Sequence, residues 1–96
     1  MTKKQLIRQR AENARLPWHD AQIEITRDEL CIAVQGTEDS TAAHTDTRPA
    51  LSRLADAIGI TAELYITGTF LHSGTYARVW LPLPKVLTYL THQGHD

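Results

Sequence analysis

Residues 76–81 carry the side chains best suited to binding another molecule. Tyr76, Arg78 and Trp80 alternate with small and aliphatic residues, so in a β-strand all three point to one face. Tyr, Trp and Arg combine large contact areas with polar tips, and they are enriched in protein-binding hot spots. Such a face can equally stack unpaired bases. With Tyr65, which we predict on the neighbouring strand, these residues form a candidate binding face, unless a helix over 3–15 covers it and its aromatics belong to the core.

A second candidate surface is the basic N-terminal segment. Residues 1–18 carry a net charge of +4, residues 19–47 of −6 and the remainder of +1. The cations of the first segment are Lys3, Lys4, Arg8, Arg10 and Arg15. They could neutralise nucleic-acid phosphates, although a total charge of −1 gives little general attraction. The same segment could dock on the acidic part of a neighbouring copy.

Residues that could hold a metal lie in segments that would not fix their geometry. The histidine and carboxylate candidates are His44, Asp46, His92, His95 and Asp96. The first two belong to a polar loop over 36–47 and the last three to the chain end, so neither group is preorganised. We therefore expect no metal and no cofactor.

Catalytic signals are equally weak. Cys31 lies within an apolar run, which is typical of a buried, unreactive thiol. Ser73 follows His72, but no Gly-x-Ser-x-Gly elbow surrounds it. The five glycines are isolated from one another, so there is no glycine-rich phosphate loop. The sequence favours a protein that is not an enzyme.

The elements that must position these residues follow from local patterning. We predict helices over 3–15, 48–58 and 84–93, and strands over 21–26, 30–34, 63–67 and 76–81. Residues 48–58 give the clearest helix, because Leu51, Leu54 and Ile58 recur on one face before Gly59. Residues 30–34 are apolar on both faces, so we expect this strand to be central.

The predicted order α-ββ-α-ββ-α is typical of an α+β fold. Two β-hairpins are not stable alone in water, so we expect them to join into one antiparallel four-stranded sheet. Helices 48–58 and 84–93 would then cover one face of this sheet in a two-layer arrangement. The pattern does not specify the strand order.

The segment 47–64, TRPALSRLADAIGITAEL, resembles part of the lambda-repressor-like helix-turn-helix family. In that family, leucine-alanine followed by glycine, a hydrophobic residue and threonine or serine recurs where one helix turns into the next. The resemblance covers about a fifth of the chain, and it implies that Thr61 caps a second helix and that DNA is the partner. We instead predict a strand over 63–67, because Tyr65, Ile66 and Thr67 are aromatic or β-branched and no Lys or Arg follows until Arg78. A helix over 61–70 would favour the repressor-like interpretation.

Length and composition indicate one α+β domain over 1–96. Within it we expect a peripheral basic helix in 1–17 and a disordered tail over 92–96. A single cysteine, no membrane-spanning run and no secretory signal favour the cytoplasm.

We therefore expect a small non-enzymatic binding or regulatory module that acts through protein–protein contacts. It would self-associate as a homodimer or small homo-oligomer, through a sheet edge or through the aromatic–arginine face. The alternative is an accessory protein that binds DNA or single-stranded RNA through its basic N-terminal helix.

Overall fold

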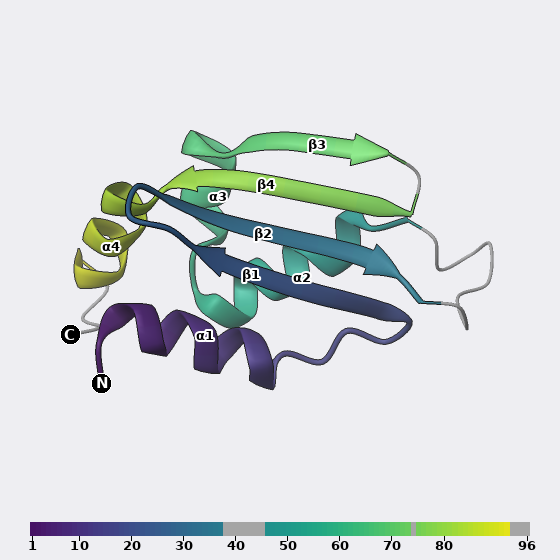
Figure 1. The fold of residues 1–96 in the computed structure, drawn as a ribbon, viewed down its shortest axis with the longest axis horizontal. Helices are drawn as coiled ribbons and strands as arrows, with labels where there is room; N and C mark the ends of the chain where they lie inside the picture. The colour runs from purple at the N-terminus through teal and green to yellow at the C-terminus, as the bar shows by residue number, and fades with distance from the viewer. Residues whose placement is uncertain (38–45, 74, 93–96) are drawn as a thin grey trace.

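Two β-hairpins and four helices make up the described part of the chain. The computed structural model describes residues 1–37, 46–73 and 75–92. Its elements are α1 (Lys3–Asn13), β1 (His19–Ile25), β2 (Glu29–Gly36), α2 (Arg48–Ile58), α3 (Thr61–Thr67), β3 (Thr69–Ser73), β4 (Tyr76–Pro82) and α4 (Leu83–His92). Figure 1 labels these elements and shows how they lie relative to one another.

The four strands form one antiparallel sheet in the order β1-β2-β4-β3. Each hairpin supplies one edge strand, and the hairpins join where β2 pairs with β4, with Ile32 opposite Val79. The central position of β2 confirms the prediction from its two apolar faces.

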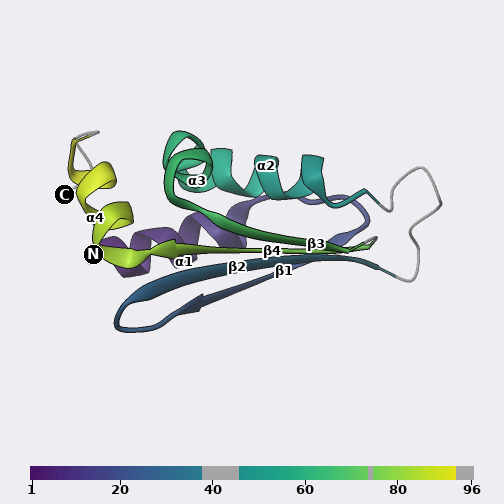
Figure 2. The ribbon, with the colours of Figure 1, turned by 90° about the horizontal axis from the view of Figure 1, so that it is seen from above.

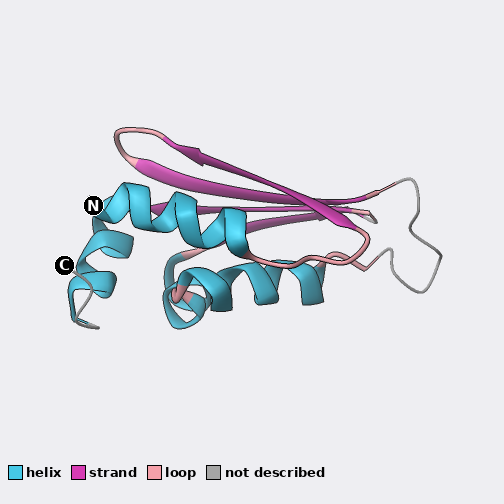
Figure 3. Ribbon diagram, turned by 90° about the horizontal axis from the view of Figure 1, so that it is seen from below, coloured by secondary structure: helices cyan, strands magenta, loops and turns pink. Residues whose placement is uncertain are grey.

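The helices gather on one side of the sheet, which confirms the two-layer α+β fold. Figures 2 and 3 show α1, α2 and α3 against the same face, with α4 at one end of the strands. Between the layers, inward-facing strand residues such as Ile32 and Val79 meet Leu54 and Ile58 of α2, and all four are fully buried. This contact is the centre of the core.

The first helix is shorter than predicted. It begins with a reciprocal cap: Gln5 N donates to Thr2 Oγ1 (3.1 Å) and Thr2 N donates to Gln5 Oε1 (2.8 Å). It ends at Asn13 instead of residue 15. Ile7 is fully buried in the core, and Arg10 Nη1 donates to Ile58 O at 2.9 Å. This helix is therefore fixed to the end of α2.

The strand predicted over 63–67 is wrong, because this segment is the helix α3. Gly59, in a left-handed conformation (φ 90°), ends α2, and Ile60 turns the chain into α3. Leu64 is buried whereas Ile66 is 74% exposed; a strand would place both side chains on one face, but a helix places them on different sides. The second hairpin exists, but its first strand is Thr69–Ser73.

Candidate binding face

The sheet face opposite the helices is the candidate site. Because Ala77, Val79 and Leu81 of β4 face the core, Tyr76, Arg78 and Trp80 point the other way, as the alternation predicted. The strand register places side chains from all four strands beside them. From here on, this surface is called the open face, and its residues are Gln22, Glu24, Cys31, Ala33, Thr69, Leu71, Tyr76, Arg78 and Trp80.

The helices in the described ranges leave the open face uncovered (Figures 2 and 3). In particular, α1 lies on the other side of the sheet, so it does not turn these aromatics into core residues. Tyr76, Arg78 and Trp80 are each half-buried. The alternative in which the helix over 3–15 covers this face is therefore excluded for the chain as described.

Arg78 is held between two aromatic rings. Its Cζ lies 5.9 Å from the centroid of the Tyr76 ring and 5.6 Å from that of Trp80. Both distances fall within the range of a cation–π attraction. The Arg78 Nε–H is shielded from solvent and has no hydrogen-bond acceptor among the described residues. The guanidinium is thus fixed in place while part of its hydrogen-bonding capacity is unused.

A shallow hollow of about 340 Å³ lies beside Arg78, lined in part by Gln22, Glu24 and Cys31. Cys31 is buried, as its apolar neighbours predicted. Burial raises the pKa of its thiol above the ordinary value, more than the positive charge of Arg78 lowers it. A protonated, buried thiol is a poor nucleophile, so this hollow suits contact with a partner better than covalent chemistry.

Tyr65 does not belong to the open face, which corrects the prediction. Because α3 replaces the predicted strand, Tyr65 lies on the helical side of the sheet. Its hydroxyl is 2.9 Å from Ser52 Oγ, and its ring stacks on Phe70 with centroids 6.2 Å apart. The structure brings together three of the four predicted residues and assigns Tyr65 to a different surface.

That second surface is an apolar patch that the sequence interpretation missed. It consists of Tyr65, Ile66 and Phe70, which are 63%, 74% and 46% exposed, while Leu71, 48% exposed, lies on the open face of the same edge strand. A hollow of about 320 Å³ between α2, α3 and β3 adjoins it. The sequence signal that could have revealed it is the run Thr69–Ser73, which contains no Asp, Glu, Lys or Arg. Phe70 and Leu71 are neighbours in this run, so a strand points one of them to each face of the sheet.

The predicted nucleic-acid residues do not join the open face. Lys3, Lys4 and Arg8 lie on α1, across the sheet from it, and Arg15 follows that helix. Arg10 donates a hydrogen bond to Ile58 O, which connects α1 to the end of α2. The basic residues therefore lie on one side of the sheet, and the rings of Tyr76 and Trp80 lie on the other. One strand of nucleic acid cannot contact both groups on a single surface.

The repressor-like resemblance is matched in local structure, because α2 and α3 are consecutive helices and α3 begins at Thr61. However, α3 has only seven residues and runs into β3. Its exposed side chains are Ala62, Tyr65 and Ile66, and it contains no Lys or Arg. A recognition helix needs polar or basic side chains to reach bases and phosphates, and α3 offers an apolar surface instead.

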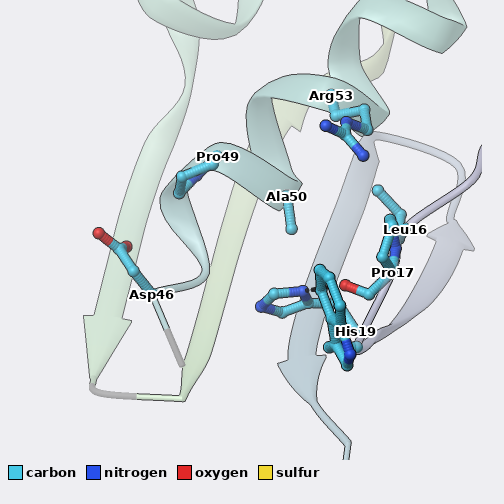
Figure 4. Close-up of a pocket in the computed structure, with 8 residues that line it drawn as sticks. Leu16, Pro17, His19, Asp46, Pro49, Ala50 and Arg53 are labelled. Carbon is cyan, nitrogen blue, oxygen red and sulfur yellow. Dashed lines mark hydrogen bonds between the residues drawn. The ribbon is translucent and has the colours of Figure 1, made fainter. Parts of the chain in front are cut away.

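A further hollow, of about 200 Å³, lies between the start of β1 and the start of α2. Figure 4 shows the side chains around it, including His19, Asp46 and Arg53. His19 Nδ1 lies 2.9 Å from Pro17 O, and Asp46 is bound to Arg48 at 2.7 Å. His19 and Asp46 thus interact with different residues and do not form an acid–base pair in this hollow.

Metal-binding geometry is absent from the described ranges, where no three His, Cys, Asp or Glu residues converge on one point. Asp46 instead pairs with Arg48, and His92 ends α4. The other residues considered as metal ligands, His44, His95 and Asp96, lie outside the described residues. None of the helices in these ranges is both long and apolar enough to cross a membrane.

Comparison of the chain with protein-family models, curated proteins and solved structures finds no match.

Proposed function

We propose that this protein is a non-enzymatic binding module that acts through protein–protein contacts in the cytoplasm. Its contact surface is the open face, and two copies of the chain associate. The observation that carries the proposal is Arg78 fixed between Tyr76 and Trp80 on a sheet face that the described helices leave uncovered.

Prearranged side chains make this face favourable for binding. An arginine normally loses rotamer freedom when it enters an interface, which costs about 0.5–1.5 kcal/mol. Because the rings of Tyr76 and Trp80 already restrict Arg78, much of that cost is met before a partner arrives. The residue types are also those in which binding energy concentrates.

The charges around Arg78 indicate what a partner must present. Arg78 carries a positive charge on this half-buried face, so a carboxylate or carbonyl oxygen on the partner would suit its guanidinium. Glu24, on the neighbouring side of the hollow, favours a basic group. A protein surface with an apolar centre and mixed charges at its rim meets both needs.

The test compares partner capture by three versions of the tagged protein. We expect a protein that co-purifies with the wild type to be reduced at least tenfold with Arg78→Ala plus Trp80→Ala. Lys85→Ala, which removes one exposed cation from α4, serves as the matched control and should retain it. Equal capture by wild type and double variant, or no capture by either, would overturn the proposal.

Nucleic-acid binding is the alternative, and it has a separate test. A gel-shift titration between about 50 and 200 mM salt reports how many phosphates the protein neutralises. If binding exists and requires Lys3, Lys4 and Arg8, then replacing all three with glutamine weakens it and flattens its salt dependence. That result would favour the alternative over the open-face proposal.

A further inference from the structure

We infer that two copies of the chain pair through the free edge of β3, antiparallel to each other, so that their two sheets become one. This inference rests on the proposed function in one respect, because self-association is part of it. The open face can bind its own partner whether or not the edges pair.

The first observation is that β3 is an unguarded edge. It is the last strand in the sheet order and pairs only with β4. All five residues, Thr69–Ser73, are exposed, and none is Asp, Glu, Lys, Arg or Pro, while His72 Nε2 lies 3.8 Å from Asp46 Oδ1. The outward N–H and C=O groups of an edge strand are a ready template for another strand, and natural monomers protect such edges with charges, prolines or covering elements.

The opposite edge provides a contrast within the same molecule. Asp20 and Glu24 lie on β1 and are exposed, so pairing two copies there would bring carboxylates together. In Figure 1, α1 lies beyond β1, whereas β3 is the outermost element on its own side. Among the described elements, one edge therefore has protection and the other has none.

The second observation is the apolar patch around that edge. Six large hydrophobic residues are exposed in the described ranges, and four of them lie at this edge: Tyr65, Ile66 and Phe70 on the helical side and Leu71 on the open face. The adjoining hollow, lined by residues such as Leu51 and Leu64, is itself largely apolar in composition. Clustered apolar residues on a small domain mark an interaction surface, and here they flank the strand that lacks a partner.

Charge points to a second copy as the occupant. Near β3, Arg48 pairs with Asp46 at 2.7 Å, Glu63 is buried, and Arg78 lies opposite Leu71 on β4. Among the described residues these two cations balance the two carboxylates, so the edge has no net charge to attract an acidic or basic peptide. An identical edge is equally neutral and apolar, so two copies approach without repulsion.

An antiparallel pairing centred on Leu71 makes the edge complementary to itself. Leu71 shares the open face with Arg78, so it would meet its own copy beside the two arginines. Phe70, on the helical side, would lie near the copy's His72. The contact between Phe70 and the copy's His72 occurs twice and the Leu71 contact lies on the axis, as twofold symmetry requires, and the two open faces become one surface.

The primary test measures the oligomeric state by sedimentation equilibrium. Leu71→Lys places two like charges at the centre of the proposed interface, and we expect the dimer dissociation constant to rise at least tenfold. Gln22→Lys, the matched control, places a lysine on the same face of the opposite edge strand and should leave the dimer intact. A monomeric wild type, or equal dimerisation of wild type and Leu71→Lys, would overturn the inference.

A second measurement on the wild type guards against a variant that fails to fold. Amide hydrogen exchange in Thr69–Ser73 should slow as protein concentration rises, whereas exchange in β1 should not change. Exchange that is independent of concentration throughout β3 would refute edge pairing. The double variant Arg78→Ala plus Trp80→Ala should remain a dimer. Partner capture therefore tests the proposed function of the open face, and the oligomeric state tests the pairing of the β3 edges.

Discussion

Asp46 and Arg48 show how a single ion pair links stability to pH. Hydrogen bonds from the side chain and backbone of Arg48 lower the pKa of Asp46 to about 2, and the same contact raises the pKa of Arg48. An unfolded aspartate has a pKa of about 3.9, so the unfolded chain takes up the proton first as the pH falls. The contribution of Asp46 to stability is complete above about pH 4 and is lost by about pH 2.

We therefore predict that Asp46→Asn removes part of the acid sensitivity of the fold. Urea unfolding of wild type and variant at a series of pH values should show a stability difference that shrinks between pH 4 and pH 2. Asp20→Asn, at a carboxylate that forms no ion pair with any described residue, should give a difference that changes less. A wild-type advantage that stays constant across this range would contradict the prediction.

Gly68 is required by space rather than by backbone angle. A Cβ at this position would lie 2.3 Å from Leu64 O and 2.8 Å from Val79 Cγ2. We predict that Gly68→Ala costs about 3 kcal/mol, because the backbone of α3 or β4 must shift. Gly59→Ala should cost about 1 kcal/mol for its positive φ, since its Cβ would meet only the flexible end of Arg10.

Denaturant midpoints at equal slopes measure both costs. A Gly68→Ala protein as stable as Gly59→Ala would show that the junction of α3 and β3 is looser than the close approach of Gly68 to Leu64 indicates.

The face on which a site residue lies could be predicted where the alternation of its own strand determines the direction of its side chain. Alternation along β4 was enough to place Tyr76, Arg78 and Trp80 on one face, because successive strand residues point in opposite directions. The placement of Tyr65 required knowing whether its segment was a strand or a helix. Its contacts with Ser52 and Phe70 depend on elements that lie apart in the sequence.

At the scale of elements, α1 is attached by few apolar groups. Only Ile7 of this helix is buried, and apart from Leu6 and Ala11 its other residues are polar. We predict that Ile7→Ala destabilises the protein by about 2–4 kcal/mol, as expected for a buried large-to-small change. Leu6→Ala, at a half-buried neighbour, should cost clearly less.

Thermal or chemical unfolding of the two variants tests this attachment. If both substitutions cost little, then α1 contributes little to the core and Ile7 is not one of its essential contacts.

The segment 61–67 shows why propensity misled at this scale. Tyr65, Ile66 and Thr67 favour strands when considered alone, but neighbouring residues decide the outcome. Leu64 must reach the core beside α2 while Ile66 stays exposed, which a helix allows and a strand, with both side chains on one face, does not. Leu64 O then accepts the N–H of Gly68 at 3.0 Å, and the next residue begins β3.

At the scale of the whole molecule, the effect of salt on dimerisation tests the proposed β3 interface. The β3 interface is apolar, and among the described residues near it the cations Arg48 and Arg78 are balanced by the carboxylates Asp46 and Glu63. We predict that the dimer dissociation constant changes less than about threefold between 0.05 and 0.5 M NaCl, because screening acts on charges and not on apolar contacts.

Sedimentation at the two salt concentrations checks this prediction. A dimer that weakens steeply with salt would instead indicate docking between the basic residues of α1 and the acidic residues of a neighbouring copy.

The sequence by itself determined the α+β class, the helix over 48–58, the central position of β2 and the shared face of Tyr76, Arg78 and Trp80. These features follow from periodicity, caps and alternation, which act over a few residues. Only the tertiary structure decided the strand order, the helical state of 61–67, the separation of Tyr65 from the open face and the exposure of the β3 edge. Each depends on which distant segments compete for the same buried surface, and local patterns do not encode the result of that competition.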